Sequence, residues 1–126
     1  MLKNLTIILE NRPGALAGAC EAIGQAGVNI EGLCCFSSAG VAILYVAVTD
    51  GAAARRAVEQ IGLKVSEERD VAVIPVEDRP GGAGMTLRRI ADAGVNFELA
   101  YQGIGKRIIV GTTDAQTLQT VLAGVS

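Results

Sequence analysis

Hydrophobic positions along the chain fall into two kinds of segment, short apolar runs and longer stretches with one apolar face. Residues 5–9 and 71–76 are short runs rich in β-branched side chains, a composition typical of strands. The stretches that follow, as far as Ala26 and Ala93, repeat apolar side chains at helical spacing. The pattern therefore predicts an alternation of short strands and amphipathic helices.

Each of these helices is followed by two more strand-type runs, which are joined by a short glycine-containing turn that suits a hairpin. The predicted strands cover residues 28–36 and 41–49 in the first half and 95–102 and 107–113 in the second. Asp50 and Asp114 come next, and we expect them to cap two further helices. The last helix has a predicted apolar face of Leu118, Leu122 and Val125.

The two halves of the chain are an internal repeat. Residues 10–31 and 77–98 align without gaps, and 10 of the 22 positions are identical. The identities cluster in two places, an Arg-Pro-Gly turn before the helix and an Ala-Gly-Val-Asn (AGVN) segment after it. The repeat predicts two domains, 1–68 and 69–126.

Each half has the order β-α-β-β-α-β, which predicts an α+β fold of two ferredoxin-like repeats, with antiparallel sheets and helices on one face. Residues 64–67 are the predicted fourth strand of the first repeat, whereas the second repeat has no matching strand before Ser126. A missing last strand leaves a sheet edge that a partner chain can cover. We therefore expect a homodimer.

The composition of the chain limits the catalytic, metal-binding and membrane functions that we expect of it. The chain has 126 residues, a net charge of −2 and no histidine, so it lacks the commonest general base at neutral pH. Cys20, Cys34 and Cys35 form no metal-ligand spacing, and we expect no metal and no cofactor. No apolar stretch is long enough to span a membrane and no signal peptide is evident, so we expect a cytoplasmic protein with no membrane partner.

Two other functions have little support in the sequence. An enzyme would rely on carboxylates such as Glu10 and Glu77, but no nucleophile, histidine or metal cluster accompanies them, and we expect no catalytic residue. A nucleic-acid partner is not expected, because the chain is acidic, has four aromatic residues and shows no basic stripe. A structural role, exerted through protein contacts without a ligand, remains the alternative.

The strand, the Asn/Asp-Arg-Pro-Gly turn and the small-residue helix ending in AGVN-Ile/Phe resemble the ACT domain family, over nearly the whole chain and twice. ACT domains are amino-acid-binding regulatory modules of metabolic enzymes. The resemblance implies a free-standing tandem ACT protein that binds a small molecule, an amino acid above all, and regulates a partner enzyme. It also implies ligand sites between modules, with Asn11–Gly14 facing Asn96 and Asp78–Gly82 facing Asn29.

The residues themselves suit a carboxylate at these turns. A helix start offers free N–H groups and a positive dipole end, glycine permits close approach, and Arg12 and Arg79 add cations. The alternative interpretation is that the turns only start helices and the arginines are solvated. The candidate ligand-binding residues are Asn11, Arg12, Pro13, Gly14, Ala15, Val28, Asn29, Ile30, Asp78, Arg79, Pro80, Gly81, Gly82, Val95, Asn96 and Phe97.

The two turns differ in sequence. The second has Asp78 where the first has Asn11, and the helix that follows begins with three glycines among four residues, 81–84. An aspartate can pair with a ligand ammonium, and extra glycines open more backbone. The sequence therefore predicts that the second turn is the better binding site.

Overall fold

The computed structural model describes residues 2–124, which form six strands and four helices in two compact units divided between Val71 and Ala72. The elements are β1 (Leu2–Glu10), α1 (Ala15–Gln25), β2 (Ile30–Ser38), β3 (Val41–Val48), α2 (Gly51–Gln60), β4 (Lys64–Pro75), α3 (Gly82–Asp92), β5 (Leu99–Gly103), β6 (Arg107–Gly111) and α4 (Ala115–Ala123). The class is α+β, and the strand pairings within each unit are antiparallel.

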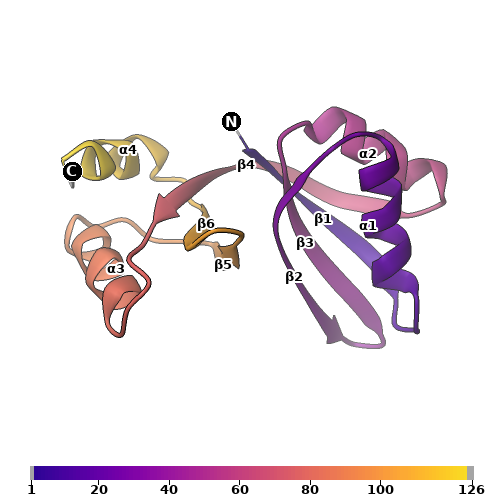
Figure 1. Ribbon diagram of the computed structural model, residues 1–126, viewed down its shortest axis with the longest axis horizontal. Helices are drawn as coiled ribbons and strands as arrows, with labels where there is room; N and C mark the ends of the chain where they lie inside the picture. Colours follow the sequence, from indigo (N-terminus) through magenta and orange to yellow (C-terminus); the bar gives the residue numbers. More distant parts are fainter. Residues whose placement is uncertain (1, 125–126) are drawn as a thin grey trace. The chain divides into compact units, whose positions relative to one another are not determined.

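The first unit is a four-stranded sheet with the order β2-β3-β1-β4 and with α1 and α2 on one face (Figure 1). Alternate residues of the central strand β1, including Leu5 and Ile7, are fully buried. They share a core with Ile23 of α1 and Val58 of α2. Each such side chain contributes about 1.5–3 kcal/mol by leaving water, so this packing positions the turn at the end of β1.

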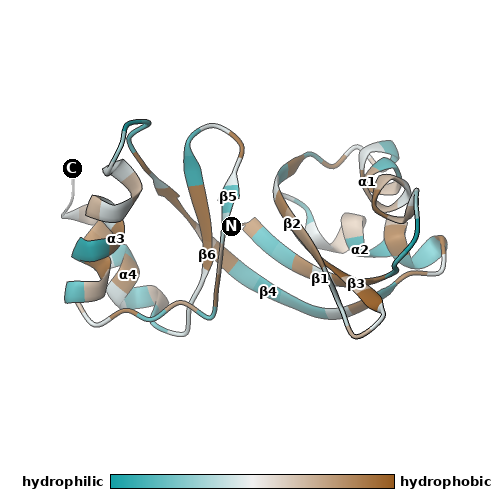
Figure 2. Ribbon diagram, turned by 90° about the horizontal axis from the view of Figure 1, so that it is seen from below, coloured by the Kyte–Doolittle hydropathy of each residue, from teal (hydrophilic) through white to brown (hydrophobic). Residues whose placement is uncertain are grey.

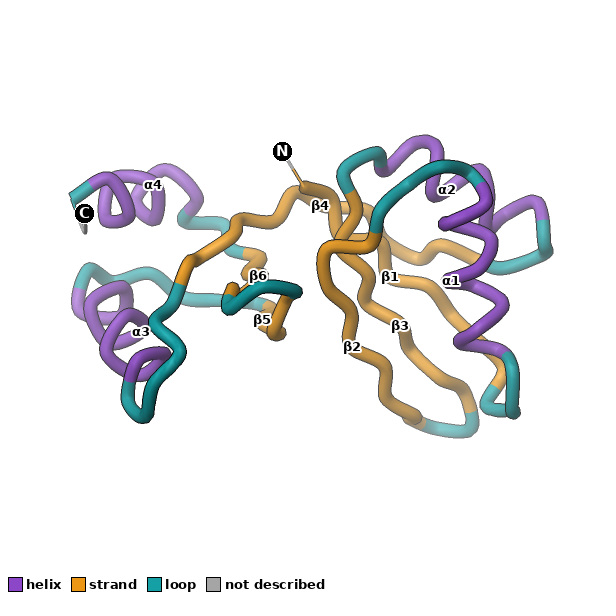
Figure 3. The backbone as a smooth tube through the Cα atoms, in the orientation of Figure 1, coloured by secondary structure: helices purple, strands orange, loops and turns teal. Residues whose placement is uncertain are grey.

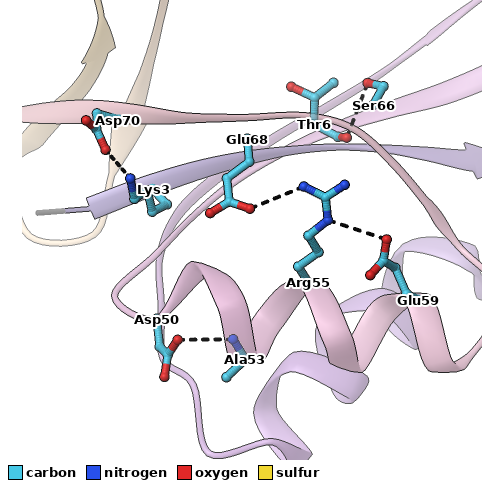
Figure 4. A network of polar contacts seen from close by, with 9 residues as sticks. All are labelled: Lys3, Thr6, Asp50, Ala53, Arg55, Glu59, Ser66, Glu68 and Asp70. Atoms are coloured by element: carbon cyan, nitrogen blue, oxygen red, sulfur yellow. Dashed lines mark hydrogen bonds and ion pairs between the residues drawn. The ribbon is translucent and has the colours of Figure 1, made fainter.

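Strand β4 is continuous from Lys64 to Pro75, whereas the sequence pattern predicted two strands, 64–67 and 71–76. No glycine or proline interrupts the polar stretch between them, and its ladder with β1 runs on to Val71. Ion pairs link this polar stretch to neighbouring elements: Lys3 of β1 binds Asp70 (Figure 4). Arg55 of α2 also reaches Glu68 and Glu59.

The second unit contains the end of β4 together with α3, β5, β6 and α4, in the sheet order β5-β6-β4 (Figure 3). Ile74, Ile90 and Leu118 are its most buried large side chains within the core, one each from β4, α3 and α4. The hydropathy colouring shows the apolar residues of β6 beside polar turns (Figure 2). In the described part of this unit no strand follows α4, and Val125 lies outside the described residues.

Strand β5 begins at Leu99, four residues later than predicted, because side chains bind the segment before it. The Asn96 N–H donates to Asp114 Oδ2 (3.1 Å), and Thr112 Oγ1 donates to the Asn96 carbonyl. The Asp114 carboxylate is thus engaged here and makes no cap bond to α4, so the expected cap is wrong. Asp50 does cap α2, accepting a bond from the Ala53 N–H at 3.0 Å, as predicted.

Candidate functional site

Backbone hydrogen bonds stabilise the turn between β1 and α1. The Arg12 N–H donates to the Glu10 carbonyl (2.9 Å), and the Ala15 N–H donates to the Arg12 carbonyl (3.3 Å). Gly14 takes a φ of 86°, a left-handed conformation that favours glycine, and is the residue that precedes α1. Because the Pro-Gly turn separates Asn11 from the helix, Asn11 does not cap it.

The turn between β4 and α3 has the same geometry. The Arg79 N–H donates to the Glu77 carbonyl and the Gly82 N–H donates to the Arg79 carbonyl, both at 3.0 Å. Gly81 has a φ of 85°. Asp78, like its counterpart, makes no cap bond to its helix. The two turns therefore present nearly the same backbone to a ligand.

The first N–H groups of α1 remain available. The Gly18 N–H donates to the Gly14 carbonyl, and in the described part of the chain the N–H groups of Leu16 and Ala17 have no backbone acceptor. The corresponding two residues of α3 are in the same state. Unused N–H groups and the positive end of the helix dipole are suited to a carboxylate.

Both turn arginines are paired with a glutamate just before the turn: Glu10 is the last residue of β1, and Glu77 lies two residues after the end of β4. Arg12 Nε lies 2.7 Å from Glu10 Oε2, and Arg79 binds Glu77 in the same way. All four side chains are at least 50% exposed, so these pairs are weak. A guanidinium has five N–H donors, and one bond to glutamate leaves others for a ligand carboxylate.

Gly82 has no room for a side chain. A Cβ at this position would lie 2.2 Å from the Glu77 carbonyl oxygen, and Gly82 is buried. Asp78, which was expected to attract a ligand ammonium, lies 3.5 Å from Lys106 Nζ. Gly82 is therefore required by the close approach of the Glu77 carbonyl, and Asp78 has an exposed ion-pair partner; that the second turn is the better site stays a prediction.

A hollow of about 180 Å³ lies beside the first turn, and we call it the first hollow. One wall is the end of β1 with the turn, another is the first two turns of α1, and the third is the loop between α2 and β4. Its lining residues are Glu10, Arg12, Gly14, Ala15, Gly18, Ala19, Ile61, Gly62 and Leu63. An adjoining hollow of about 330 Å³ shares Glu10, Gly62 and Leu63 with it.

The second hollow lies beside the second turn and has a volume of about 300 Å³. Four of its lining positions match those of the first at the repeat offset, but larger side chains, Met85 and Thr86, replace Gly18 and Ala19. Among the described residues of this unit, its walls come from the end of β4, the turn that follows it and α3. The remaining lining residues are Pro75, Val76, Glu77, Gly82 and Arg89.

The sequence of residues 5–73, more than half of the chain, matches the AHAS small subunit-like ACT domain. The chain belongs to this ACT family. This confirms the resemblance seen at the Arg-Pro-Gly turn and the AGVN segment. No curated protein matches the chain.

Solved structures share the fold of this ACT protein. Protein BT0572 from Bacteroides thetaiotaomicron is 26% identical with a TM-score of 0.82, covering 97% of this chain and 86% of that one. The ligand-free regulatory subunit of aspartate kinase from Thermus thermophilus is 18% identical with a TM-score of 0.76, covering 98% and 89%. The corresponding subunit from Thermus flavus is 16% identical with a TM-score of 0.69, covering 98% and 91%.

The AGVN segment of each ACT unit lies at the far end of the helix from the turn, about 16 Å away for an 11-residue helix. A turn and the AGVN segment of the same unit are therefore not brought together. Gly27 and Gly94 follow the helices with φ of 78° and 85°. Val28 and Val95 are buried, and Ile30 and Phe97 pack against the cores of their units.

The two asparagines of these segments have local partners. The Asn29 side-chain amide donates to the Glu31 carboxylate, and the Asn96 backbone is bound by Thr112 and Asp114. Among the described residues, both hydrogen bonds of Asn96 are made by its backbone and neither by its side-chain amide. Asn96 therefore has the freer side chain of the two.

Sequence reasoning missed one wall of the first hollow. Ile61, Gly62 and Leu63 follow α2, far along the chain from the turn. Gly62 has a φ of 88° and lets the chain reverse from α2 into β4 beside the end of β1. A glycine directly after an apolar helix was the available signal, because it marks a helix end that the sheet order then places next to the first strand.

No group of three or more potential metal ligands lies together in the described residues. Across the same residues, no helix has both the length and the apolar character needed to cross a membrane.

Proposed function

We propose that this ACT protein is a regulatory protein that binds an amino acid and catalyses no reaction on it. One observation carries the proposal: the start of α1 has unused N–H groups, and Arg12, Gly14 and Ala15 of the same turn line a hollow of about 180 Å³. The ligand carboxylate binds the N–H groups of Leu16 and Ala17, and Arg12 supplies a further donor. The side chain of the ligand enters the first hollow.

The rest of each site comes from a second module. On this proposal, Val95–Phe97 complete the site at Asn11–Ala15, and Val28–Ile30 complete the site at Asp78–Gly82. These segments belong to the other repeat or to a second copy of the chain. Support comes from the geometry within each unit, because the helix length keeps its own AGVN segment away from its turn.

Binding is proposed to regulate a partner enzyme. The family is named for a small subunit, and two structures with this fold are regulatory subunits of aspartate kinase. A homodimer is the proposed assembly. The alternative is regulation by protein contact alone, in which the turns bind no ligand.

A thermal-shift screen with each of the twenty amino acids tests the proposal. A ligand that binds only the folded state raises stability by about 2.7 kcal/mol at a concentration a hundred times its Kd. The same amino acid as its amide should give no shift, because it lacks the carboxylate. If no amino acid shifts the melting temperature, the ligand-binding function is wrong and the contact-only alternative stands.

Arg12→Ala tests the turn itself. Loss of a charge-assisted hydrogen bond of about 1.5–3 kcal/mol should weaken binding roughly tenfold or more by titration calorimetry. Arg56→Ala is the matched control, since Arg56 is an exposed arginine on α2 that lines none of the three hollows. Equal affinities of the two variants would place the ligand elsewhere.

A further inference from the structure

We infer that the second hollow binds an amino acid with an acidic side chain, and that Arg89 of α3 selects the side-chain carboxylate. This inference rests on the proposed function, because it takes the second turn as a site for the α-carboxylate of the ligand. It goes beyond that proposal in naming the ligand class of the second site and a residue outside the Arg-Pro-Gly turn.

Arg89 is a cation without a partner. It lines the second hollow, and within the described chain it makes no ion pair and no side-chain hydrogen bond. The neighbouring Arg88 is paired with Asp92 at 4.0 Å and does not line the hollow. The other charged lining residue, Glu77, is bound by Arg79. The hollow therefore keeps one uncompensated positive charge, on a group that can bind a carboxylate through two parallel N–H···O bonds.

The remaining lining of the second hollow suits a short side chain that ends in an acid. Pro75, Val76 and Met85 offer apolar contact to methylene groups. The Thr86 hydroxyl also lines the hollow, and no hydrogen bond engages it in the part of the chain that the structure describes. A hydroxyl can donate to a carboxylate. The hollow thus combines apolar walls with two donors for one anion, as small-molecule sites commonly do.

Helix α3 brings Arg89 to the same face as the second turn. The lining residues of this helix recur at helical spacing, Gly82, Met85, Thr86 and Arg89. The Arg89 Cα lies about 7.5 Å along the helix axis from Gly84, one of the two residues with an unused N–H group. Long helical side chains lean back toward the N-terminus, so the guanidinium lies closer to these N–H groups than its Cα does. An amino acid with two carboxylates can therefore reach both.

The first unit lacks both donors. At the repeat offset, Ala22 stands at the position of Arg89 and Ala19 at that of Thr86. The charged lining residues of the first hollow, Glu10 and Arg12, are paired with each other. The first hollow thus offers no unpaired cation to a ligand side chain, and the two units are expected to prefer different amino acids.

The experiment compares Arg89→Ala with Arg88→Ala. Both remove an exposed arginine from the same helix and change the net charge equally, but Arg88 lines none of the three hollows. Titration calorimetry measures the binding of L-aspartate, L-glutamate, L-asparagine and L-glutamine to the parent chain and both variants. Sodium acetate reports the binding of a bare carboxylate. Melting temperatures of the unliganded proteins check folding.

The parent chain should bind at least one of the two acidic amino acids about tenfold or more tightly than its amide, the effect of one charge-assisted hydrogen bond. Arg89→Ala should abolish this preference. Arg88→Ala should keep it within about twofold, because an exposed charge outside the hollow contributes little. Arg89→Lys retains the charge without the planar fork, so its preference should fall between those of the parent chain and Arg89→Ala. It keeps the inference testable if the alanine variant does not fold.

The outcomes separate the two proposals. If other amino acids bind but the acidic ones bind no better than their amides, the ligand class is wrong and the proposed function stands. If Arg89→Ala keeps the preference of the parent chain, the role of Arg89 is wrong. Acetate that binds as tightly as the acidic amino acids would reduce the hollow to an unselective anion site and overturn the inference. If nothing in the full set of twenty amino acids binds the parent chain, both proposals fall.

Discussion

Replacing Gly82 with alanine should destabilise the second unit, even though the change adds one methyl group. The new Cβ would lie 2.2 Å from the Glu77 carbonyl oxygen and 3.0 Å from its carbonyl carbon. Both are backbone atoms of the turn that follows β4, so the backbone of the turn must shift to accept the methyl group. Overpacking of this kind costs typically about 1–3 kcal/mol, which exceeds the gain of about 0.5–1 kcal/mol from replacing a helical glycine.

Gly84→Ala is the matched control, because Gly84 lies in the same helix and a Cβ there meets nothing within 4 Å. It should stabilise the protein by about 0.5–1 kcal/mol. Urea unfolding followed by far-ultraviolet circular dichroism measures both, and the two midpoints should move in opposite directions. If Gly82→Ala is as stable as Gly84→Ala, the proposed role of the Glu77 contact is refuted.

Three further predictions concern the surface and the thiols. Asp50→Ala should cost about 1 kcal/mol in urea unfolding, because it removes the cap bond to the Ala53 N–H. The ion pair with Lys3 lowers the pKa of Asp70 from its ordinary value of 3.8, so its stabilising effect should be present above that value and lost as pH falls below it. The same ion pair raises the pKa of Lys3 above its ordinary value of 10.5. The stabilising effect of the pair should therefore persist below pH 10.5 and be lost as pH rises through the pKa of Lys3 in the folded protein. Melting temperatures of the parent chain and of Asp70→Asn, measured across this pH range, check the loss at low pH and the loss at high pH. Burial raises the pKa of the Cys20 thiol, so Ellman's reagent should react with it more slowly in the folded protein than in urea, as followed in a Cys34→Ser/Cys35→Ser background.

Much of the fold was predictable because local pattern and tertiary packing agree. The period of the apolar residues around Leu5 and Ile23 matched a strand and a helix, and both residues are fully buried in the first core. The positive φ of Gly27 agrees with the general rule that helices often end on glycine. Where a residue type has only one common structural role in its sequence context, the sequence pattern is sufficient to predict the local structure.

The remaining features depend on contacts between segments distant in sequence. Nothing near Asp114 indicates that its carboxylate would bind the Asn96 N–H in preference to its own helix. The burial of Gly82 likewise depends on how the Glu77 carbonyl is turned. A short polar side chain or a glycine can have several structural roles, such as a helix cap, a turn or a close backbone contact. Only the folded backbone determines which of these roles it has.

The candidate site was predictable in part. The turn residues Arg12 and Gly14 do line a hollow, together with Ala15. The loop 61–63 was not foreseen, because the sheet order brings it to the end of β1 across some fifty residues of chain. The predicted domain boundary after residue 68 and the assignment of ligand contacts stay predictions.

The backbone-held turns have a consequence for redesign. Gly14 and Gly81 set the entry into the helices through their own conformation, and no side chain caps either helix. The Asn11 side chain therefore does not stabilise the start of the helix, and it can be varied with little risk to the fold. A library at this position would change recognition chemistry on a fixed backbone, which is the arrangement that a designer of small-molecule sensors looks for in a scaffold.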